Sequence, residues 1–316
     1  MTLETTAVIG AGTMGHALAL VHALGGCRVR LHDSNPEVLA AAPDLIRAAL
    51  ATLEEAGSLS GAEGRAALDR ISLSDTLAEA VAGADLVVEA VVEKPEVKRA
   101  VFARIDAHAP PTAILASNTS YLDVFPLIPV ARQARAAVAH WYTPPYIVDL
   151  VDLAPGPQTA PEVIEDLRAL YTGFGKMPVV FDRLVPGYIA NRLQAALNLE
   201  SLRMIDEGWV SAQDIDRSIQ HGLVHRLAVL GHMKKMDYTG LEMVRNGIAG
   251  RRYQPPGNNG ETPVLDRLIA AGRSGVRAGA GFYDYGDTPA EELFRDRDLQ
   301  LLRLKAHLQN LKGESK

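Results

Sequence analysis

The chain begins with short apolar runs separated by turns and helical stretches. Thr5–Ile9 is an apolar run, and the glycine-rich segment 10–15 follows it directly. Apolar residues then recur at helical spacing to about Gly25, and Arg28–Asp33 alternates between polar and apolar residues. This order predicts a strand, a glycine turn, a helix and a second strand that ends in an acidic residue.

The alternation of strands and helices continues as far as residue 181. Asp85–Val91 is apolar on both faces, which indicates a strand buried inside a parallel sheet. Further strands are predicted at 71–74, 113–116, 136–141, 148–153 and 177–181. Helices are predicted at about 36–56, 61–68, 76–81, 95–108 and 161–174. Strands that alternate with helices favour an α/β fold with a doubly wound sheet of the Rossmann type.

A different pattern begins at Pro186, where long helical periodicity replaces the strands. Residues 251–263 form a polar loop rich in proline and glycine. Helices are expected at about 187–208, 211–221, 231–248 and 263–271. We therefore expect an α/β domain at residues 1–185 and an all-α domain at residues 186–316.

The composition narrows the class of protein. Of the 316 residues, 47% are hydrophobic and 22% are charged, which is ordinary for a soluble globular protein. The formal net charge of −6, without a basic run, argues against nucleic acid as a partner. No apolar stretch approaches the roughly 20 residues of a membrane span, and no signal peptide is expected ahead of the first strand.

Cysteine and histidine usage excludes two kinds of site. Cys27 is the only cysteine, so we expect neither an intrachain disulfide nor a cysteine-based metal cluster. The nine histidines are scattered along the chain, and no metal site is expected. Together these features favour a reducing, cytoplasmic compartment.

Gly10, Gly12 and Gly15 fit the dinucleotide-binding pattern G-x-G-x-x-G in the context that this pattern requires, between a strand and a helix. Gly10 allows the tight turn, Gly12 lets the backbone approach a diphosphate, and Gly15 lets helix and strand pack closely. Asp33 can accept hydrogen bonds from the adenosine ribose, and its charge repels a 2′-phosphate, which favours NAD over NADP. The alternative is a purely structural glycine turn.

His140 lies at the end of a predicted strand, where open α/β sheets bind their ligands. A general base for alcohol oxidation must titrate near neutrality, as histidine does. Such a base also needs an orienting carboxylate, for which Asp152 and Asp149 are the candidates. The alternative is a strand-end histidine that only satisfies local hydrogen bonds.

Several segments resemble the L-3-hydroxyacyl-CoA dehydrogenase family, in family order and at close to family spacing. They are Gly10–Gly15, Val88–Glu93 together with Lys98, Ser117–Ser120, His140 with its proline-containing loop, Pro186–Leu193 and Gly279–Tyr285. The resemblance covers almost the whole chain. It implies an NAD-dependent oxidoreductase with a Rossmann domain, a helical second domain, a small-molecule substrate and a homodimeric assembly.

The resemblance also implies roles for individual residues. His140 corresponds to the catalytic base, and Asp152 takes the place of the glutamate that orients it, with a side chain one methylene shorter. Ser120 corresponds to a serine that contacts the substrate oxygen and the nicotinamide, and Asn191 to an asparagine near the substrate carbonyl. The implied cofactor contacts are Gly10, Gly12, Thr13, Met14, Gly15, Asp33, Glu93, Lys98, Ser120, Thr143 and Arg277.

Some of these cofactor positions carry an alternative or a departure from the family. Glu93 and Lys98 could instead form a surface ion pair on the helix after the strand. Thr143 stands where the family usually has asparagine, and Arg277 where it usually has lysine. Arginine keeps the positive charge but presents it with a different geometry.

Other departures concern the substrate. Family members that use CoA thioesters tend to carry lysines in the region of residues 41–70, which here contains no lysine and more acidic than basic residues. Segment 222–231 is longer than in the CoA enzymes and resembles branches that oxidise gulonate, carnitine or pyridine carboxylates. Arg226 in this segment could bind a substrate carboxylate, or it could lie along a helix or a subunit interface.

We therefore expect oxidation of the 3-hydroxy group of a small hydroxy acid or 3-hydroxyacyl compound. One alternative is a genuine 3-hydroxyacyl-CoA dehydrogenase of fatty acid metabolism, which acts on 3-hydroxybutyryl-CoA. An alternative of another class is a non-catalytic, crystallin-like protein that binds NAD.

Overall fold

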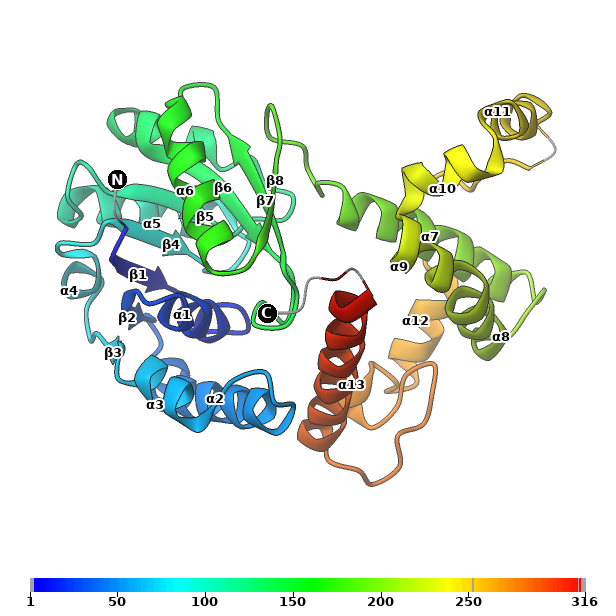
Figure 1. Ribbon diagram of the computed structural model, residues 1–316, viewed down its shortest axis with the longest axis horizontal. Helices are drawn as coiled ribbons and strands as arrows, with labels where there is room; N and C mark the ends of the chain where they lie inside the picture. The colour runs from blue at the N-terminus through cyan, green and yellow to red at the C-terminus, as the bar shows by residue number, and fades with distance from the viewer. Residues whose placement is uncertain (1–2, 252, 312, 314–316) are drawn as a thin grey trace. The chain divides into compact units, whose positions relative to one another are not determined.

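The computed structural model describes residues 3–251, 253–311 and 313, which fall into two compact units, Met1–Tyr188 and Ile189–Lys316 (Figure 1). The first unit is α/β and the second is helical. The first unit extends slightly past the boundary expected from the sequence, because residues 187 and 188 are tied to it. The Gly187 N–H donates to the Ser120 carbonyl at 2.8 Å, and the Tyr188 hydroxyl donates to the Thr119 carbonyl at 2.9 Å.

The first unit is built on one eight-stranded sheet with the order β3-β2-β1-β4-β5-β6-β7-β8. Every neighbouring pair is parallel except β6 and β7, which run antiparallel. The strands are β1 (Thr5–Ile9), β2 (Arg28–His32), β3 (Ile71–Leu73), β4 (Leu86–Glu89), β5 (Ile114–Ser117), β6 (Ala136–Trp141), β7 (Leu150–Pro155) and β8 (Met177–Val180). The doubly wound α/β fold expected from the sequence is confirmed. The strand order reverses between β1 and β4, and such sheets bind ligands at this switch point, beyond the carboxyl ends of the strands.

Helices cover both faces of this sheet (Figure 1). One face packs against α1 (Gly15–Leu24), α2 (Pro36–Glu55), α3 (Gly61–Leu68) and α6 (Pro161–Gly173). The other face packs against α4 (Leu77–Val81) and α5 (Pro95–His108). Two 3-10 segments, η1 (Phe125–Leu127) and η2 (Val130–Arg135), lie between β5 and β6. Because both faces are covered, strands such as β4 are buried along their whole length.

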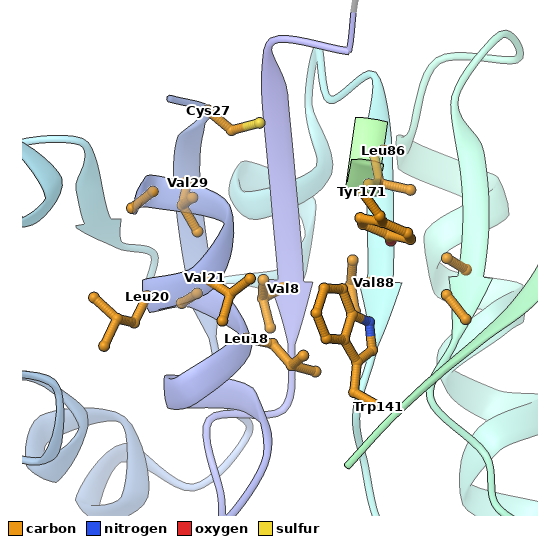
Figure 2. Packing of buried hydrophobic residues seen from close by; sticks show 14 of the residues in the cluster. Val8, Leu18, Leu20, Val21, Cys27, Val29, Leu86, Val88, Trp141 and Tyr171 are labelled. Atoms are coloured by element: carbon orange, nitrogen blue, oxygen red, sulfur yellow. The ribbon is translucent and has the colours of Figure 1, made fainter. Parts of the chain in front are cut away.

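Figure 2 shows the apolar cluster on the α1 and α6 side of the sheet. Leu18 and Val21 of α1 pack against Val8 of β1. Tyr171 of α6 meets Trp141 of β6 edge to face, with ring centroids 4.9 Å apart. Aromatic pairs in this arrangement contribute about 0.5–1.5 kcal/mol beyond the area that they bury. The cluster thereby anchors β6, the strand that carries His140.

A buried histidine interrupts this apolar cluster. His22 of α1 has no exposed surface and lies among the rings of Trp141, Tyr171 and Phe174. Its Nδ1 lies 2.9 Å from the Leu18 carbonyl oxygen, whereas its Nε2 has no hydrogen-bond partner among the described residues. Burial lowers the pKa of His22 to about 4, although the hydrogen bond to Leu18 opposes this shift.

Stability should therefore fall in acid through His22. Between its ordinary pKa of 6.5 and its folded pKa of about 4, the unfolded chain binds a proton that folded His22 does not. The folded state therefore has its full stability with respect to His22 above pH 6.5. It loses about 3 kcal/mol of that stability by the time the pH has fallen to 4. His22→Gln should remove this part of the pH dependence when urea unfolding is followed at several pH values. His108→Gln, at an exposed site on α5, should keep the wild-type slope; an unchanged slope in His22→Gln would contradict the assignment.

Among its described residues the second unit contains helices and, apart from two isolated β-bridges, no β-structure. They are α7 (Ala190–Asp206), α8 (Ala212–Ser218), the π-helical turn η3 (Ile219–Val224), α9 (His225–Leu230), α10 (His232–Thr239), α11 (Leu241–Ala249), α12 (Pro263–Ala270), the 3-10 turn η4 (Val276–Ala278) and α13 (Ala290–Leu311). The helix expected over 231–248 is broken at Gly240, whose φ of +92° suits glycine and not a helix interior. Helix α13 was not expected. Only three of its residues are buried, although Leu301, Leu304, Leu308 and Leu311 recur at helical spacing in its sequence.

The second unit buries little apolar surface within the single chain. Helices α7, α9, α10 and α11, all of them described throughout, contain no buried residue. A hollow of about 440 Å³ is lined by residues of α7, α8 and α12, including Leu197, Ile205 and Leu265. A helical unit with so much exposed apolar surface is poorly stabilised on its own.

Candidate active site

The turn between β1 and α1 has the geometry of a dinucleotide-binding loop. Gly10 has a φ of +99°, and a Cβ there would lie 2.6 Å from the Ala90 carbonyl oxygen. A Cβ on Gly15 would lie 1.6 Å from the Gly10 carbonyl oxygen, so larger residues cannot occupy these two positions without a shift of the backbone. A Cβ on Gly12, in contrast, would meet nothing within 4 Å among the described residues. The space in front of Gly12 is open, as the approach of a diphosphate requires.

The start of α1 also suits an anion. Within the described chain, no side chain caps the helix and its first turn contains no acidic residue. The first N–H groups and the positive end of the helix dipole are thus available to a phosphate. Thr13 is exposed and Met14 is half-buried, so both loop residues border this opening.

Asp33 follows β2 and braces the same loop. Its Oδ2 accepts the Ala11 N–H at 2.7 Å, and its Oδ1 accepts the Asn35 N–H at 2.8 Å. A carboxylate offers about four acceptor positions, so two backbone donors leave capacity for ribose hydroxyls. The residues around this loop therefore fit an NAD molecule. They also show a second role for Asp33 that the sequence motif does not reveal, which is to hold the glycine turn in place.

Asp33→Ala should shift the cofactor preference away from NAD. Loss of the brace to Ala11 weakens the binding of both cofactors, whereas loss of the carboxylate removes the ribose contact of NAD and the repulsion of a 2′-phosphate. The ratio of kcat/KM for NAD to that for NADP should thus fall by about tenfold or more. Asn35→Ala, which keeps the carboxylate, should leave the ratio as it is. An unchanged ratio in Asp33→Ala would count against a ribose contact.

His140 lies near the end of β6, with its side chain only 4% exposed. Its Nε2 is 3.1 Å from the Ser120 hydroxyl oxygen, and its Nδ1 is 3.4 Å from Asp152 Oδ2. Asp152 is brought there by strand register, because His140 and Asp152 are directly paired across antiparallel β6 and β7. Asp149, the other candidate partner, instead lies 3.6 Å from the Lys176 ammonium. The structure therefore distinguishes between the two aspartates and brings Ser120, His140 and Asp152 into one line.

Two tyrosines that the sequence analysis did not identify enclose the His140 ring. Tyr188 stacks on it with centroids 4.6 Å apart and planes at 23°, and Tyr142 meets it edge-on at 4.7 Å. The Tyr142 hydroxyl donates to Asp152 Oδ2 at 2.6 Å. Burial raises the pKa of Tyr188, and the negative charges of Asp152 and Glu93 raise it further, so this phenol stays protonated. The spacing of Tyr142, two residues after His140, is the sequence signal that could have indicated a shared face.

Ser120 is positioned by the loop that follows β5. The Asn118 side-chain oxygen accepts the Trp141 N–H at 2.9 Å, which joins this loop to β6. Glu93 Oε1 accepts the Ser120 N–H at 3.1 Å and also the Thr119 hydroxyl. Burial alone would raise the pKa of Glu93, but the Thr119 hydroxyl and the charge of Lys98 outweigh it, so that the pKa is lowered. Glu93 thus remains charged and holds the serine loop.

Lys98 of α5 is fully buried and forms ion pairs with Glu89 and Glu93. Its ammonium lies 2.7 Å from Glu89 Oε1 and 3.2 Å from Glu93 Oε2. Glu89 also accepts the Ser117 hydroxyl at 2.5 Å and the Val91 N–H at 2.8 Å. The alternative of a surface ion pair is right about the pairing of Glu93 with Lys98 and wrong about the exposure of Lys98. With no exposed surface, the Lys98 side chain supports the site from inside the protein.

The remaining predicted positions lie at the cofactor loop and in the helical unit. The Thr143 hydroxyl lies 3.0 Å from the Met14 sulfur, which brings the loop after β6 against the glycine turn. Asn191 stands at the start of α7 and is half-buried. Arg226 of α9 is exposed and donates from Nε to the Gly222 carbonyl of its own helical segment at 2.8 Å. Arg277 is exposed and lies 5.1 Å from the centre of the Phe294 ring.

The described residues contain no group of three His, Cys, Asp or Glu side chains that could hold a metal ion. No helix in the described ranges combines the length and the apolar character that a membrane span needs.

Comparisons with known proteins match both units of the chain. Residues 5–184 match the family model for the NAD binding domain of 3-hydroxyacyl-CoA dehydrogenase, and residues 187–285 match the model for its C-terminal domain. L-carnitine dehydrogenase from Streptomyces griseus is 36% identical over 96% of this chain and 89% of its own length. A probable 3-hydroxybutyryl-CoA dehydrogenase from Bacillus subtilis is 32% identical over 90% of this chain and 98% of its own.

A third relative is similar along both chains. The 5-formyl-3-hydroxy-2-methylpyridine 4-carboxylate 5-dehydrogenase of Mesorhizobium japonicum is 28% identical over 97% of this chain and 99% of its own. The solved structure of an enzyme with this name, described as an NAD+-dependent dismutase, superposes with a TM-score of 0.87 and covers 98% of this chain and 99% of that one, at 27% identity. On these grounds the chain belongs to the 3-hydroxyacyl-CoA dehydrogenase family of NAD-dependent oxidoreductases.

Proposed function

We propose that this protein oxidises the 3-hydroxy group of a small free hydroxy acid, with NAD as the oxidant and His140 as the general base. The observation that carries this proposal is the line from Ser120 through His140 to Asp152, at the same end of the sheet as the glycine turn. A histidine is suited to remove a hydroxyl proton when one ring nitrogen donates to a carboxylate and the other faces the substrate hydroxyl.

The residues divide the work of proton transfer. With Asp152 as the acceptor for the Nδ1 proton of His140, the Nε2 lone pair faces Ser120 and can take the proton of the substrate hydroxyl. The Asp152 charge then stabilises the imidazolium that forms. Ser120 holds the reacting oxygen from the other side, and Asn191 is expected from the family resemblance to hold the neighbouring carbonyl.

NAD supplies the hydride acceptor when it is bound. Gly10, Gly12 and the first turn of α1 would receive its diphosphate, and Asp33 its adenosine ribose. Glu93 and Lys98 would contribute indirectly, because they keep the Ser120 loop in position. Thr143 and Arg277 remain expected cofactor contacts.

The charges on α2 and α3 favour a free acid over a CoA ester. Residues 41–70 contain five acidic residues and three arginines, Arg47, Arg65 and Arg70. Arg47 is paired with Asp44, and Arg70 donates to the carbonyl oxygens of Ala66 and Ala23 at 3.1 and 3.5 Å. Five acidic residues against three arginines leave this region with a formal charge of −2, which offers little attraction to the phosphates of CoA.

The named substrates of the relatives include both free acids and a CoA ester. L-carnitine and the pyridine carboxylate are substrates named for relatives that match nearly the whole chain, and neither is a CoA ester. The Bacillus subtilis relative, whose name is that of a 3-hydroxybutyryl-CoA dehydrogenase, keeps the CoA ester as the second candidate. In the free-acid case, Arg226 is the residue expected to bind the substrate carboxylate.

A paired substrate screen tests the proposal. NADH formation should be measured with 3-hydroxybutyrate and 3-hydroxybutyryl-CoA, and with gulonate, carnitine and hydroxymethylpyridine carboxylic acids. We expect kcat/KM for at least one free acid to exceed that for the CoA ester by about tenfold or more. Preference for the CoA ester would overturn the free-acid assignment. No NADH with any of these compounds would favour a non-catalytic role.

We also propose a homodimer in the cytoplasm. The exposed apolar residues of α7, α10 and α11, such as Leu193, Met233 and Ile248, would be covered by a second copy. The single cysteine, Cys27, is buried and free, as expected of a protein in a reducing compartment. Light scattering after gel filtration should give twice the chain mass of 33.9 kDa; the mass of one chain would contradict the dimer.

A further inference from the structure

The carboxylate that faces His140 has two donors competing for one oxygen. Tyr142 donates its hydroxyl to Asp152 Oδ2 at 2.6 Å, and His140 Nδ1 approaches the same oxygen at 3.4 Å. The other oxygen, Oδ1, is buried and has no hydrogen-bond partner among the described residues. The contact from the tyrosine has the length of a strong hydrogen bond to a charged acceptor, whereas the contact from the histidine is longer than usual.

This asymmetry follows from the length of the aspartate side chain. Register places Asp152 directly opposite His140, so the backbones cannot slide to shorten the gap. A glutamate would extend one methylene further towards the imidazole. The Tyr142 ring occupies the space beside the carboxylate and packs edge-on against the His140 ring at 4.7 Å. Tyr142 therefore contacts both members of the pair.

We propose that Tyr142 is a positioning residue for His140, which acts through the Asp152 carboxylate by taking up part of its negative charge. Tyr142 acts on His140 through Asp152 and does not touch the reacting atoms. Its hydroxyl stabilises the carboxylate of Asp152 whether or not His140 is protonated. Asp152 therefore stabilises the imidazolium less than a carboxylate without this second donor would. This inference rests on the proposed role of His140 as the base.

The other ionisable groups around the pair stay constant in a test of Tyr142. Tyr188 stacks on His140 from the end of the first unit and remains protonated. Glu93 is ion-paired with the ammonium of Lys98 at 3.2 Å. Ser120 faces Nε2 with a hydroxyl that carries no charge. A change in the titration of His140 on removal of the Tyr142 hydroxyl therefore reports on Asp152.

The test is an NMR titration of the full-length protein labelled with ¹³C at histidine, which requires no substrate. The His140 signal is assigned by its loss in His140→Asn. In Tyr142→Phe, the pH midpoint of this signal should rise by about half to one pH unit, because Asp152 then gives its full charge to the imidazolium. Tyr238→Phe, which removes an exposed phenol hydroxyl from α10, is the matched control and should leave the midpoint unchanged.

A second pair of variants tests whether the effect of Tyr142 on His140 depends on the short side chain of Asp152. In Asp152→Glu the carboxylate should reach His140 directly, so that adding Tyr142→Phe shifts the midpoint by less than half of the shift seen in the wild-type background. An equal shift in both backgrounds, no shift at all, or a downward shift in Tyr142→Phe would overturn the proposal. A change in melting temperature without a change in midpoint would likewise reduce Tyr142 to a packing residue. Activity lost in His140→Ala tests the proposed function separately, since the titration does not depend on turnover.

Discussion

Replacing His140 with alanine should lower kcat by about 10²–10⁴, the usual contribution of a general base. The variant loses the only imidazole between Ser120 and Asp152, and the Asp152 carboxylate is too far back to replace it, since its Oδ2 lies on the Nδ1 side of the ring. Binding of NADH, measured by fluorescence titration, should stay within about threefold of the wild-type value, because the glycine turn and Asp33 are untouched.

The control for this variant is His108→Ala. His108 is exposed at the end of α5, and its replacement should preserve both kcat and the Kd for NADH. If His140→Ala turned over the substrate found in the screen at close to the wild-type rate, the assignment of the base would be wrong. A loss of NADH binding in parallel with kcat would instead indicate a local collapse of the site.

Lys98→Met should destabilise the first unit by about 3–5 kcal/mol, the typical cost of leaving one charge of a buried ion pair without its partner. Lys98 and Glu89 are both fully buried, and the carboxylate of Glu89 would keep only its hydrogen bonds from Ser117 and Val91. The free energy of unfolding in urea, followed by circular dichroism, measures the loss.

Two further variants separate the buried charge from the loss of the side chain itself. Glu89→Gln combined with Lys98→Met removes both charges and should recover most of the stability. Lys94→Met, at the exposed start of the same helix, should change the stability by less than about 0.5 kcal/mol. A stable Lys98→Met single variant would contradict the burial of the pair.

Periodicity was a good guide where one face or both faces of an element are buried. Helices 61–68 and 95–108 have the bounds expected from the sequence, because their buried positions recur at helical spacing. The strand 136–141 also has the expected bounds, because all six of its residues are buried. Helix α13 was not expected even though Leu301, Leu304, Leu308 and Leu311 recur at helical spacing, and only three of its positions are buried. The break at Gly240 depends on a backbone conformation that a single glycine permits but does not require.

The sequence predicted which residues form the site, but only in part which residues they contact. The positions of Gly10, Asp33 and His140 followed from strand ends, which are local features of the chain. The choice of Asp152 over Asp149 depends on the register between two strands, which one sequence does not define. The burial of Lys98 depends on Glu89, a residue on another element.

The antiparallel pairing of β6 and β7 separates the geometry of the catalytic pair from the loop that joins the strands. His140 and Asp152 face each other through the sheet, so the connection between residues 143 and 149 need not define their distance. An insertion within that connection would leave the pair facing, whereas one extra residue inside β7 would turn the carboxylate to the opposite face. This loop is therefore a place where new substrate pockets can evolve, or be engineered, while the proton-transfer chemistry is preserved.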